Sequence, residues 1–206
     1  MKKHLFIILA LTLFVTGSVF AQKTVTNSYV FSTGNTTYGG DLGLSYTTVI
    51  VAGQDNATSG LLPLPFIFNY LGQTYTHWSV TSNGLITLGN IGSTPLTGLE
   101  TSNLMAASTP GLKIAPYWDD ISTGNNGYVK WAYYSGTMYI NFRVTVPKSA
   151  GATNAEFQVR LSANGGIGLY YGTTVTKNIL ANSGLYSIGI GVSIPNSPSC
   201  SKKNRL

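Results

Sequence analysis

Residues 138–146 read MYINFRVTV, and the apolar side chains of this stretch fall on every second position. Five apolar residues alternate with four more polar ones, namely Met138, Ile140, Phe142, Val144 and Val146 against Tyr139, Asn141, Arg143 and Thr145. Successive side chains of a β-strand point to opposite sides of the sheet. The period of two therefore predicts a strand that buries one face and leaves the other polar.

The same pattern recurs in residues 156–161, where Phe157, Val159 and Leu161 are expected to point inward and the residues between them outward. Residues 147–154 between the two strands are interpreted as a loop. Asn164-Gly165-Gly166 follows the second strand, and Ser82-Asn83-Gly84 lies between two further apolar runs. Asn and Gly tolerate positive φ, so the sequence predicts hairpins over residues 156–171 and 74–88.

Strand signals separated by Gly, Asn, Ser and Pro continue along the chain. Further strands are expected at Tyr29–Ser32, Tyr46–Val51, Pro65–Phe68, Thr74–Val80, Leu85–Leu88, Ile114–Trp118, Tyr128–Tyr134, Ile167–Tyr171 and Tyr186–Ile194. Residues 99–108 are the one stretch with a helical pattern. About eleven short strands without alternating helices predict an all-β fold, an antiparallel, jelly-roll-like β-sandwich with at most one short helix.

The N-terminus has the three parts of a cleavable signal peptide. Lys2 and Lys3 precede the apolar run 5–15, and Val19-Phe20-Ala21 offers a cleavage site. A membrane-spanning helix needs about 20 apolar residues, and this run is too short for one. We therefore expect a signal peptide over residues 1–21, a single sandwich domain over 22–195, and a polar, disordered tail over 196–206 where a longer protein could have been truncated.

Charge and cysteine content restrict the function. The chain has 12 basic and 6 acidic residues, but five of the cations lie in the signal peptide or among the last five residues. A nucleic-acid-binding protein needs a basic face within its fold, and the sequence predicts none. The lone Cys200 cannot form an internal disulfide, so stability must come from the core and the sheets.

Catalytic residues are scarce. His77 is the one histidine after the signal peptide and lies within a strand pattern, and Cys200 is too close to the terminus to be a well-positioned nucleophile. A β-sandwich glycoside hydrolase would need two carboxylates facing each other across a cleft. Asp119 with Glu156 is the pair that remains open, but no pattern supports it, and the expectation is that the protein is not an enzyme.

The segment Ile114-Ala115-Pro116-Tyr117-Trp118-Asp119-Asp120 ends in two adjacent carboxylates and is followed by a Gly/Asn-rich loop. Two interpretations of Asp119 and Asp120 are open. They could ligate Ca²⁺, which is the one cofactor considered, or they could accept hydrogen bonds from loop N–H groups and fix the turn. The second interpretation is favoured, because the regular spacing of a calcium loop is missing.

Aromatic residues cluster around the same segment. Flat rings give a large contact area at a small entropic cost, so exposed ones would suit a glycan or protein ligand. The candidates for ligand binding are Tyr117, Tyr128, Trp131 and Tyr134. The competing interpretation is that such rings form the core, as is expected in particular of Trp118, Trp131 and Tyr133.

Three segments together resemble a known family: Phe66 to Tyr75, Trp78 to Gly89 with its Ser-Asn-Gly turn, and Ile114 to Asp120. The order of these features, followed by Gly127-Tyr128-Val129-Lys130-Trp131, is similar to that of the extracellular nidogen-like (NIDO) domain. It also resembles a module of bacterial surface proteins exported by type IX secretion, but we expect no sorting domain in the residues after Ile194. The resemblance covers about Leu64 to Tyr171. It implies an extracellular β-rich module in adhesion or matrix assembly, with no catalytic residues.

The sequence therefore predicts a secreted or cell-surface recognition module that binds an extracellular glycan or protein, without nucleic acid and without a membrane span after signal cleavage. In the absence of a further export signal the protein would be periplasmic. The alternatives are a structural spacer domain of a larger surface protein and a glycoside hydrolase.

Overall fold

The computed structural model describes residues 38, 40–70, 72–97, 111–146, 148, 151–173, 175 and 187–193. They all belong to one compact unit, residues 33–206. The predicted signal peptide, the strand at 29–32, the helix at 99–108 and the tail at 196–206 lie outside the described residues. Among those that are described, no helix has the length and hydrophobicity needed to cross a membrane.

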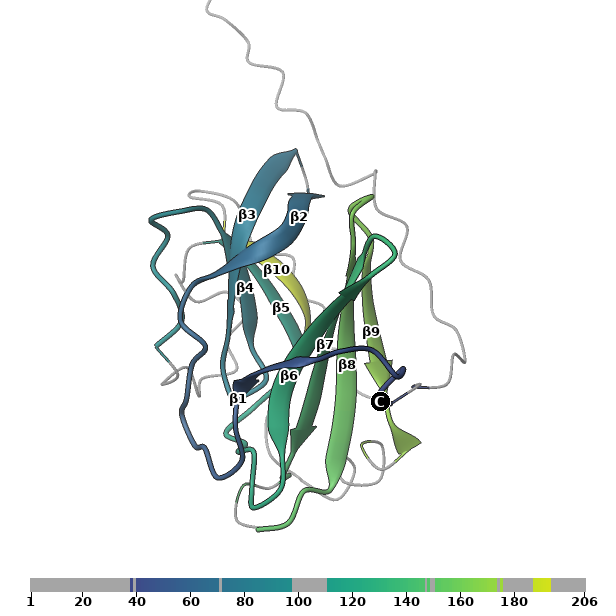
Figure 1. Ribbon diagram of the computed structural model, residues 1–206. Helices are drawn as coiled ribbons and strands as arrows, with labels where there is room; N and C mark the ends of the chain where they lie inside the picture. Colours follow the sequence, from purple (N-terminus) through teal and green to yellow (C-terminus); the bar gives the residue numbers. More distant parts are fainter. Residues whose placement is uncertain are drawn as a thin grey trace, which may run out of the picture. The chain divides into compact units, whose positions relative to one another are not determined.

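Ten strands occur in the described residues. They are β1 (Thr47–Ile50), β2 (Leu62–Tyr70), β3 (Gln73–Val80), β4 (Ile86–Gly89), β5 (Gly111–Trp118), β6 (Tyr128–Tyr134), β7 (Thr137–Val144), β8 (Ala155–Ser162), β9 (Ile167–Tyr171) and β10 (Ser187–Ser193). Figure 1 shows them as two layers, antiparallel sheets with the orders β1-β6-β7-β8-β9 and β10-β5-β4-β3-β2. The predicted all-β antiparallel sandwich is confirmed.

The strand order refines the jelly-roll-like expectation. Strands β2 to β5 follow one another within one sheet, and strands β6 to β9 follow one another within the other. Each sheet is thus a meander, extended at one edge by the first or the last strand. A jelly roll is instead built from two Greek keys, whose long connections separate consecutive strands.

The core lies between the two sheets, and the predicted alternation accounts for it. Met138, Ile140, Phe142 and Val144 of β7 are fully buried, as are the three inward residues of β8. The rings of Phe142 and Phe157 stack with centroids 4.7 Å apart. Side chains of the opposite sheet complete this core, including Trp78, Ile114 and Tyr117.

Both predicted hairpins are present. Strands β3 and β4 pair from Val80↔Ile86 outward, and β8 pairs with β9 from Leu161↔Ile167. Gly84 and Gly165 have φ of +77° and +91° in the two turns, values that only glycine adopts at little cost. The Asn-Gly signals therefore identified these turns for the right physical reason.

The segment before β1 crosses the outer face of the β6–β9 sheet, which is the face turned away from the core (Figure 1). Asp41 of this segment accepts hydrogen bonds from Lys130 of β6 and from Asn141 of β7. As a result Asn141 and Gln158 are fully buried although they lie on the polar side of their strands. Burial also raises the pKa of the Tyr38 phenol, at the start of the same segment.

Candidate functional site

Asp119 and Asp120 follow β5 and make different contacts. Asp119 Oδ1 accepts the main-chain N–H of Asp120 at 2.8 Å, and its Oδ2 accepts the Tyr117 hydroxyl at 3.4 Å. Burial raises the pKa of the Asp119 carboxyl, and these hydrogen bonds offset part of the rise. Asp119 thus makes the local backbone contact of a turn-forming residue.

Asp120 points instead to a lysine. Lys148 Nζ lies 2.9 Å from Asp120 Oδ2 and 3.4 Å from Asp55 Oδ2. An ammonium group thus lies beside Asp120, one of the two candidate calcium ligands, and it raises the electrostatic cost of binding a second cation there. In the part of the chain that the structure describes, no three His, Cys, Asp or Glu side chains are grouped as metal ligands would be.

Two of the four aromatic candidates face the core. Tyr117 is fully buried, and its ring lies 6.3 Å from that of Phe157. This contradicts a role for Tyr117 in ligand contact, since its position on β5 turns the ring inward. Trp131 is half-buried and packs edge-on against Trp78, with centroids 6.1 Å apart.

The other two candidates, Tyr128 and Tyr134, lie on the outer face at opposite ends of β6. Tyr134 has 61% of its surface exposed. The Tyr128 ring lies under the ammonium of Lys130, 4.2 Å from its centroid. Burial alone would lower the pKa of Lys130, but its hydrogen bond to Asp41 holds that pKa above the usual value.

The register of β7, β8 and β9 brings a second group of residues together on the outer face. Tyr139 is opposite Arg160, and Arg160 is opposite Gly168. Directly opposed residues of antiparallel strands point to the same side, so these three positions form a row across the sheet. Tyr170 lies next to this row, on the same side as Gly168.

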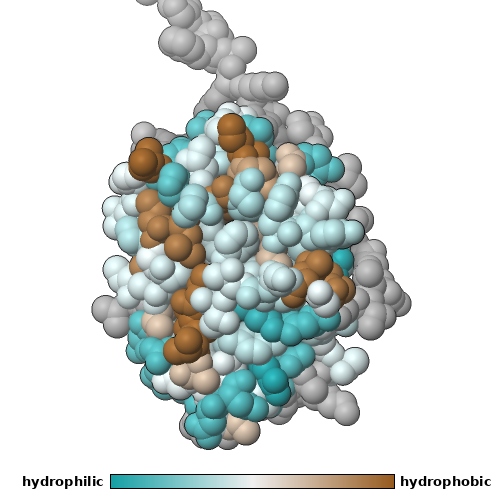
Figure 2. Space-filling model, in the orientation of Figure 1, coloured by the Kyte–Doolittle hydropathy of each residue, from teal (hydrophilic) through white to brown (hydrophobic). Residues whose placement is uncertain are grey.

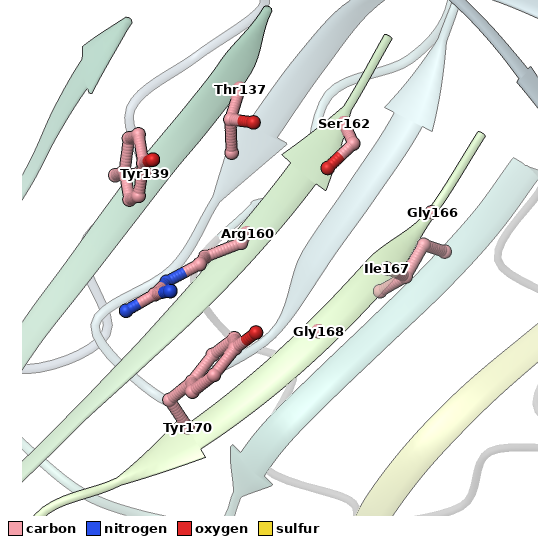
Figure 3. Close-up of a pocket in the computed structure, with 8 residues that line it drawn as sticks. All are labelled: Thr137, Tyr139, Arg160, Ser162, Gly166, Ile167, Gly168 and Tyr170. Carbon is pink, nitrogen blue, oxygen red and sulfur yellow. The ribbon is translucent and has the colours of Figure 1, made fainter. Parts of the chain in front are cut away.

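The guanidinium of Arg160 lies between two tyrosine rings (Figure 3). Its central carbon is 3.8 Å from the ring centroid of Tyr170 and 5.4 Å from that of Tyr139. Gly168 makes this arrangement possible, because a Cβ at that position would lie 2.6 Å from the Tyr170 ring. Such cation–π contacts hold a flexible arginine side chain in one orientation.

A chain of hydrogen bonds fixes Arg160 from the other side. Arg160 Nε donates to Gln158 Oε1 at 2.5 Å, and Gln158 Nε2 donates to Asn141 Oδ1 at 2.7 Å. Asn141 Nδ2 then donates to Asp41 Oδ1 at 3.0 Å. The chain ends on the segment that crosses the outer face, so this segment and Arg160 are held in place together.

These residues line an open depression of about 320 Å³, which we call the Arg160 depression. The residues that line it are Thr137, Tyr139, Arg160, Ser162, Gly166, Ile167, Gly168 and Tyr170. Figure 3 shows the hydroxyl groups of Thr137 and Ser162 on the same face as the guanidinium. Thr137 is opposite Tyr134 of β6, which the sequence predicts as a ligand-binding residue, so Tyr134 extends this surface toward β6.

The sequence contained part of the signal for this site. The period of two placed Tyr139 and Arg160 on the outer face, but it did not show that they are neighbours. That depends on the β7–β8 register, which is set across a loop rather than by a tight turn. Tyr170 lies at the end of a predicted strand, and its approach to Arg160 depends on Gly168.

The surface elsewhere carries scattered apolar groups. Figure 2 shows a broken band of apolar atoms within a mostly polar or weakly polar face. The large apolar side chains that are exposed include Leu42, Val51, Ile67, Ile91, Tyr133 and Tyr134. Isolated apolar groups of this kind are normal on a protein surface.

The residues considered for catalysis are not brought together. Glu156 lies on the outer face of β8, where its carboxylate is 3.4 Å from Arg143 Nε. Asp119 follows β5 in the other sheet and is bonded to the Asp120 N–H. His77 of β3 is half-buried, and its Nδ1 lies 2.9 Å from the Thr76 hydroxyl.

Comparison with known proteins adds a family assignment. A family model described as NIDO related matches residues 28–205. The resemblance to the nidogen-like domain is thereby confirmed at the level of a related family, over more of the chain than the motifs covered. Neither the search of curated proteins nor the search of solved structures found a match.

Proposed function

The chain belongs to the NIDO-related family, and on this premise we propose that it is an extracellular, non-catalytic recognition module that binds glycan through the Arg160 depression. The family suggests an extracellular setting, and the signal-peptide pattern of residues 1–21 agrees with export. We place the protein in the secreted or cell-surface fraction, or in the periplasm if no second export step follows.

One observation carries the proposal. Arg160 is held between Tyr139 and Tyr170 in an open depression on the outer face of the sheet. A site whose side chains are already ordered loses little conformational entropy when a ligand binds. Tyrosine rings beside hydroxyl groups offer both stacking surfaces and hydrogen bonds, which suits a sugar.

Catalysis forms no part of the proposal. The carboxylate pair that glycoside hydrolysis would use, Asp119 and Glu156, comes from two different sheets, and each side chain is engaged with another group. The spacer alternative draws support from Tyr117 and Trp118, which are buried and leave fewer aromatic rings for a ligand. The exposed ring of Tyr134 and the half-buried rings of Tyr139 and Tyr170 on the outer face favour recognition over this alternative.

Binding to a glycan array tests the proposal, with the protein purified after export. The wild type should bind a subset of glycans, and the double variant Tyr139→Ala/Tyr170→Ala should lose that binding. Tyr133→Ala is the matched control, because Tyr133 is 48% exposed but packs beside Phe66, away from the outer face. Absence of binding to any glycan, or full binding by the double variant, would refute the proposal.

A further inference from the structure

We propose that the Arg160 depression recognises a carboxylate-bearing sugar, that is, a uronate unit of an acidic polysaccharide. The inference rests on the proposed function and goes further, since it specifies the charge and the chemical class of the ligand. It follows from the charges around Arg160, from the hydrogen-bonding groups that the depression offers, and from the shape of its walls.

The first step concerns charge. The ion pairs among the described residues join Lys130 to Asp41, Arg143 to Glu156, and Lys148 to both Asp55 and Asp120. No described carboxylate pairs with Arg160. Its guanidinium therefore brings a positive charge to the depression that this part of the protein does not neutralise, and an anionic ligand would.

The second step concerns hydrogen bonds. The Nε–H of Arg160 is used by Gln158, and the two tyrosine rings cover parts of the guanidinium plane. For the two Nη groups, no acceptor is found among the described residues. A carboxylate can accept two parallel N–H bonds from an arginine, which gives both strength and a fixed orientation. The depression thus offers an ordered donor pair of the kind that a carboxylate requires.

The third step distinguishes a sugar from an acidic peptide. Thr137 and Ser162 place hydroxyl groups beside the arginine, and these can donate to or accept from the hydroxyl groups of a sugar ring. Tyr139 and Tyr170 provide flat walls for the C–H face of such a ring. Gly166 and Gly168 add no side chains to the lining, and the Tyr170 ring packs over Gly168. A peptide side chain would find no deep apolar pocket in this open surface.

The test compares oligogalacturonate with its methyl ester, which has the same sugar rings without the charge. In titration calorimetry on the protein purified after export, the acid should bind at least about tenfold more tightly than the ester, as expected for a charge-assisted pair. Arg160→Gln should remove this preference. Arg160→Lys should retain only part of it, because lysine cannot bond in the bidentate manner.

Arg143→Gln is the matched control, since Arg143 lies on the same outer face but is paired with Glu156. It should leave the preference for the acid unchanged. Circular dichroism melts of all variants establish that each one is folded. Binding of the acid should also weaken with added salt, whereas binding of a neutral sugar should not.

The outcomes separate the two proposals. Equal binding of acid and ester, or an unchanged preference in Arg160→Gln, overturns the uronate inference and leaves the recognition function standing. The inference is overturned in the same way if neutral glycans bind but oligogalacturonate, oligoguluronate and a hyaluronan fragment do not. Competition by a poly-glutamate peptide as strong as that of the oligosaccharide would show that the site reads charge alone and would refute the sugar assignment. If no glycan binds at all, the proposed function of glycan recognition is refuted as well.

Discussion

A Cβ atom placed on Gly84 would lie 1.9 Å from the main-chain oxygen of Tyr117. The turn between β3 and β4 therefore rests directly on the end of β5, and the Asp119 N–H donates to the Asn83 carbonyl at 3.2 Å across the same contact. Two of the segments that carry the family resemblance, the Ser-Asn-Gly turn and the strand ending in Trp-Asp-Asp, thus form one structural junction. Their joint occurrence in a sequence is explained by this contact without any ligand.

Substitution of Gly84 by alanine should disrupt this junction. The added methyl group would overlap a backbone oxygen, and alanine is also strained at a φ of +77°. We expect Gly84→Ala to lower the free energy of unfolding by about 3 kcal/mol or more. Urea denaturation followed by tryptophan fluorescence measures it.

Gly72→Ala is the control for this effect. Gly72 has a φ of +75°, but a Cβ there would meet no atom within 4 Å. Its cost should be only that of the backbone conformation, about 1 kcal/mol. Equal losses for the two variants would show that the contact with Tyr117 does not constrain the turn.

The fold could be predicted from the sequence because its signals are local. Alternation along β7 and β8 identified the inward residues, and Asn-Gly turns located both hairpins. The site could not be predicted in the same way. It depends on register between strands and on a segment before β1 that lies 100 residues from its partner Asn141. No periodicity reports such a contact, and for this reason Asn141 and Gln158 were expected to be exposed.

The same limit applies to Tyr117. The ring was a candidate for a ligand because Asp119 and Asp120 follow it in a loop. The strand ends at Trp118, as the sequence predicts, and Tyr117 faces the core. Residues on both faces of β5 are buried, so alternation along this strand does not show which side chains meet the other sheet.

Asp119 should stabilise the fold through its oxygen as a hydrogen-bond acceptor, and the charge of its carboxylate should not be needed. Asparagine preserves the oxygen that receives the Asp120 N–H and removes the buried charge. Asp119→Asn should therefore be at least as stable as the wild type at neutral pH, and Asp119→Ala should be less stable by about 1 kcal/mol. Thermal melts of the three proteins make the comparison.

The pH dependence gives a sharper test of the same residue. The pKa of the Asp119 carboxyl is raised in the folded protein, mainly by burial. Folding then favours the protonated form, so the contribution of this group to stability is fully present below its unfolded pKa of about 3.9 and is lost as the pH rises through the folded value. The advantage of Asp119→Asn should accordingly vanish below about pH 4. An advantage that instead grew toward acid pH would contradict the burial of this charge.

Calcium should leave the stability of the protein unchanged. Lys148 already lies between Asp55 and Asp120, and Asp119 is occupied by a backbone N–H. A ligand of the folded state present at a hundredfold excess over its Kd would add about 2.7 kcal/mol, which a thermal melt detects easily. We expect equal melting midpoints with excess Ca²⁺ and with chelator. A calcium-dependent rise that disappears in Asp119→Asn/Asp120→Asn would identify this loop as a metal site after all.

Two aromatic residues of β6 should have different roles: Trp131 should stabilise the fold, and Tyr134 should contribute to binding at the surface. Trp131 packs edge-on against the fully buried Trp78, whereas Tyr134 is 61% exposed on the outer face. Trp131→Ala should lower the free energy of unfolding by about 2–3 kcal/mol, and Tyr134→Ala should change it by no more than about 0.5 kcal/mol. Chemical denaturation measures both values, and glycan binding is then assayed under conditions where each variant is folded.

Tyr134→Ala should weaken binding, since this ring borders the Arg160 depression, while Trp131→Ala should retain the affinity of the wild type. The reverse pattern, with binding lost only in folded Trp131→Ala, would move the ligand site from the outer face to the edge between the two sheets.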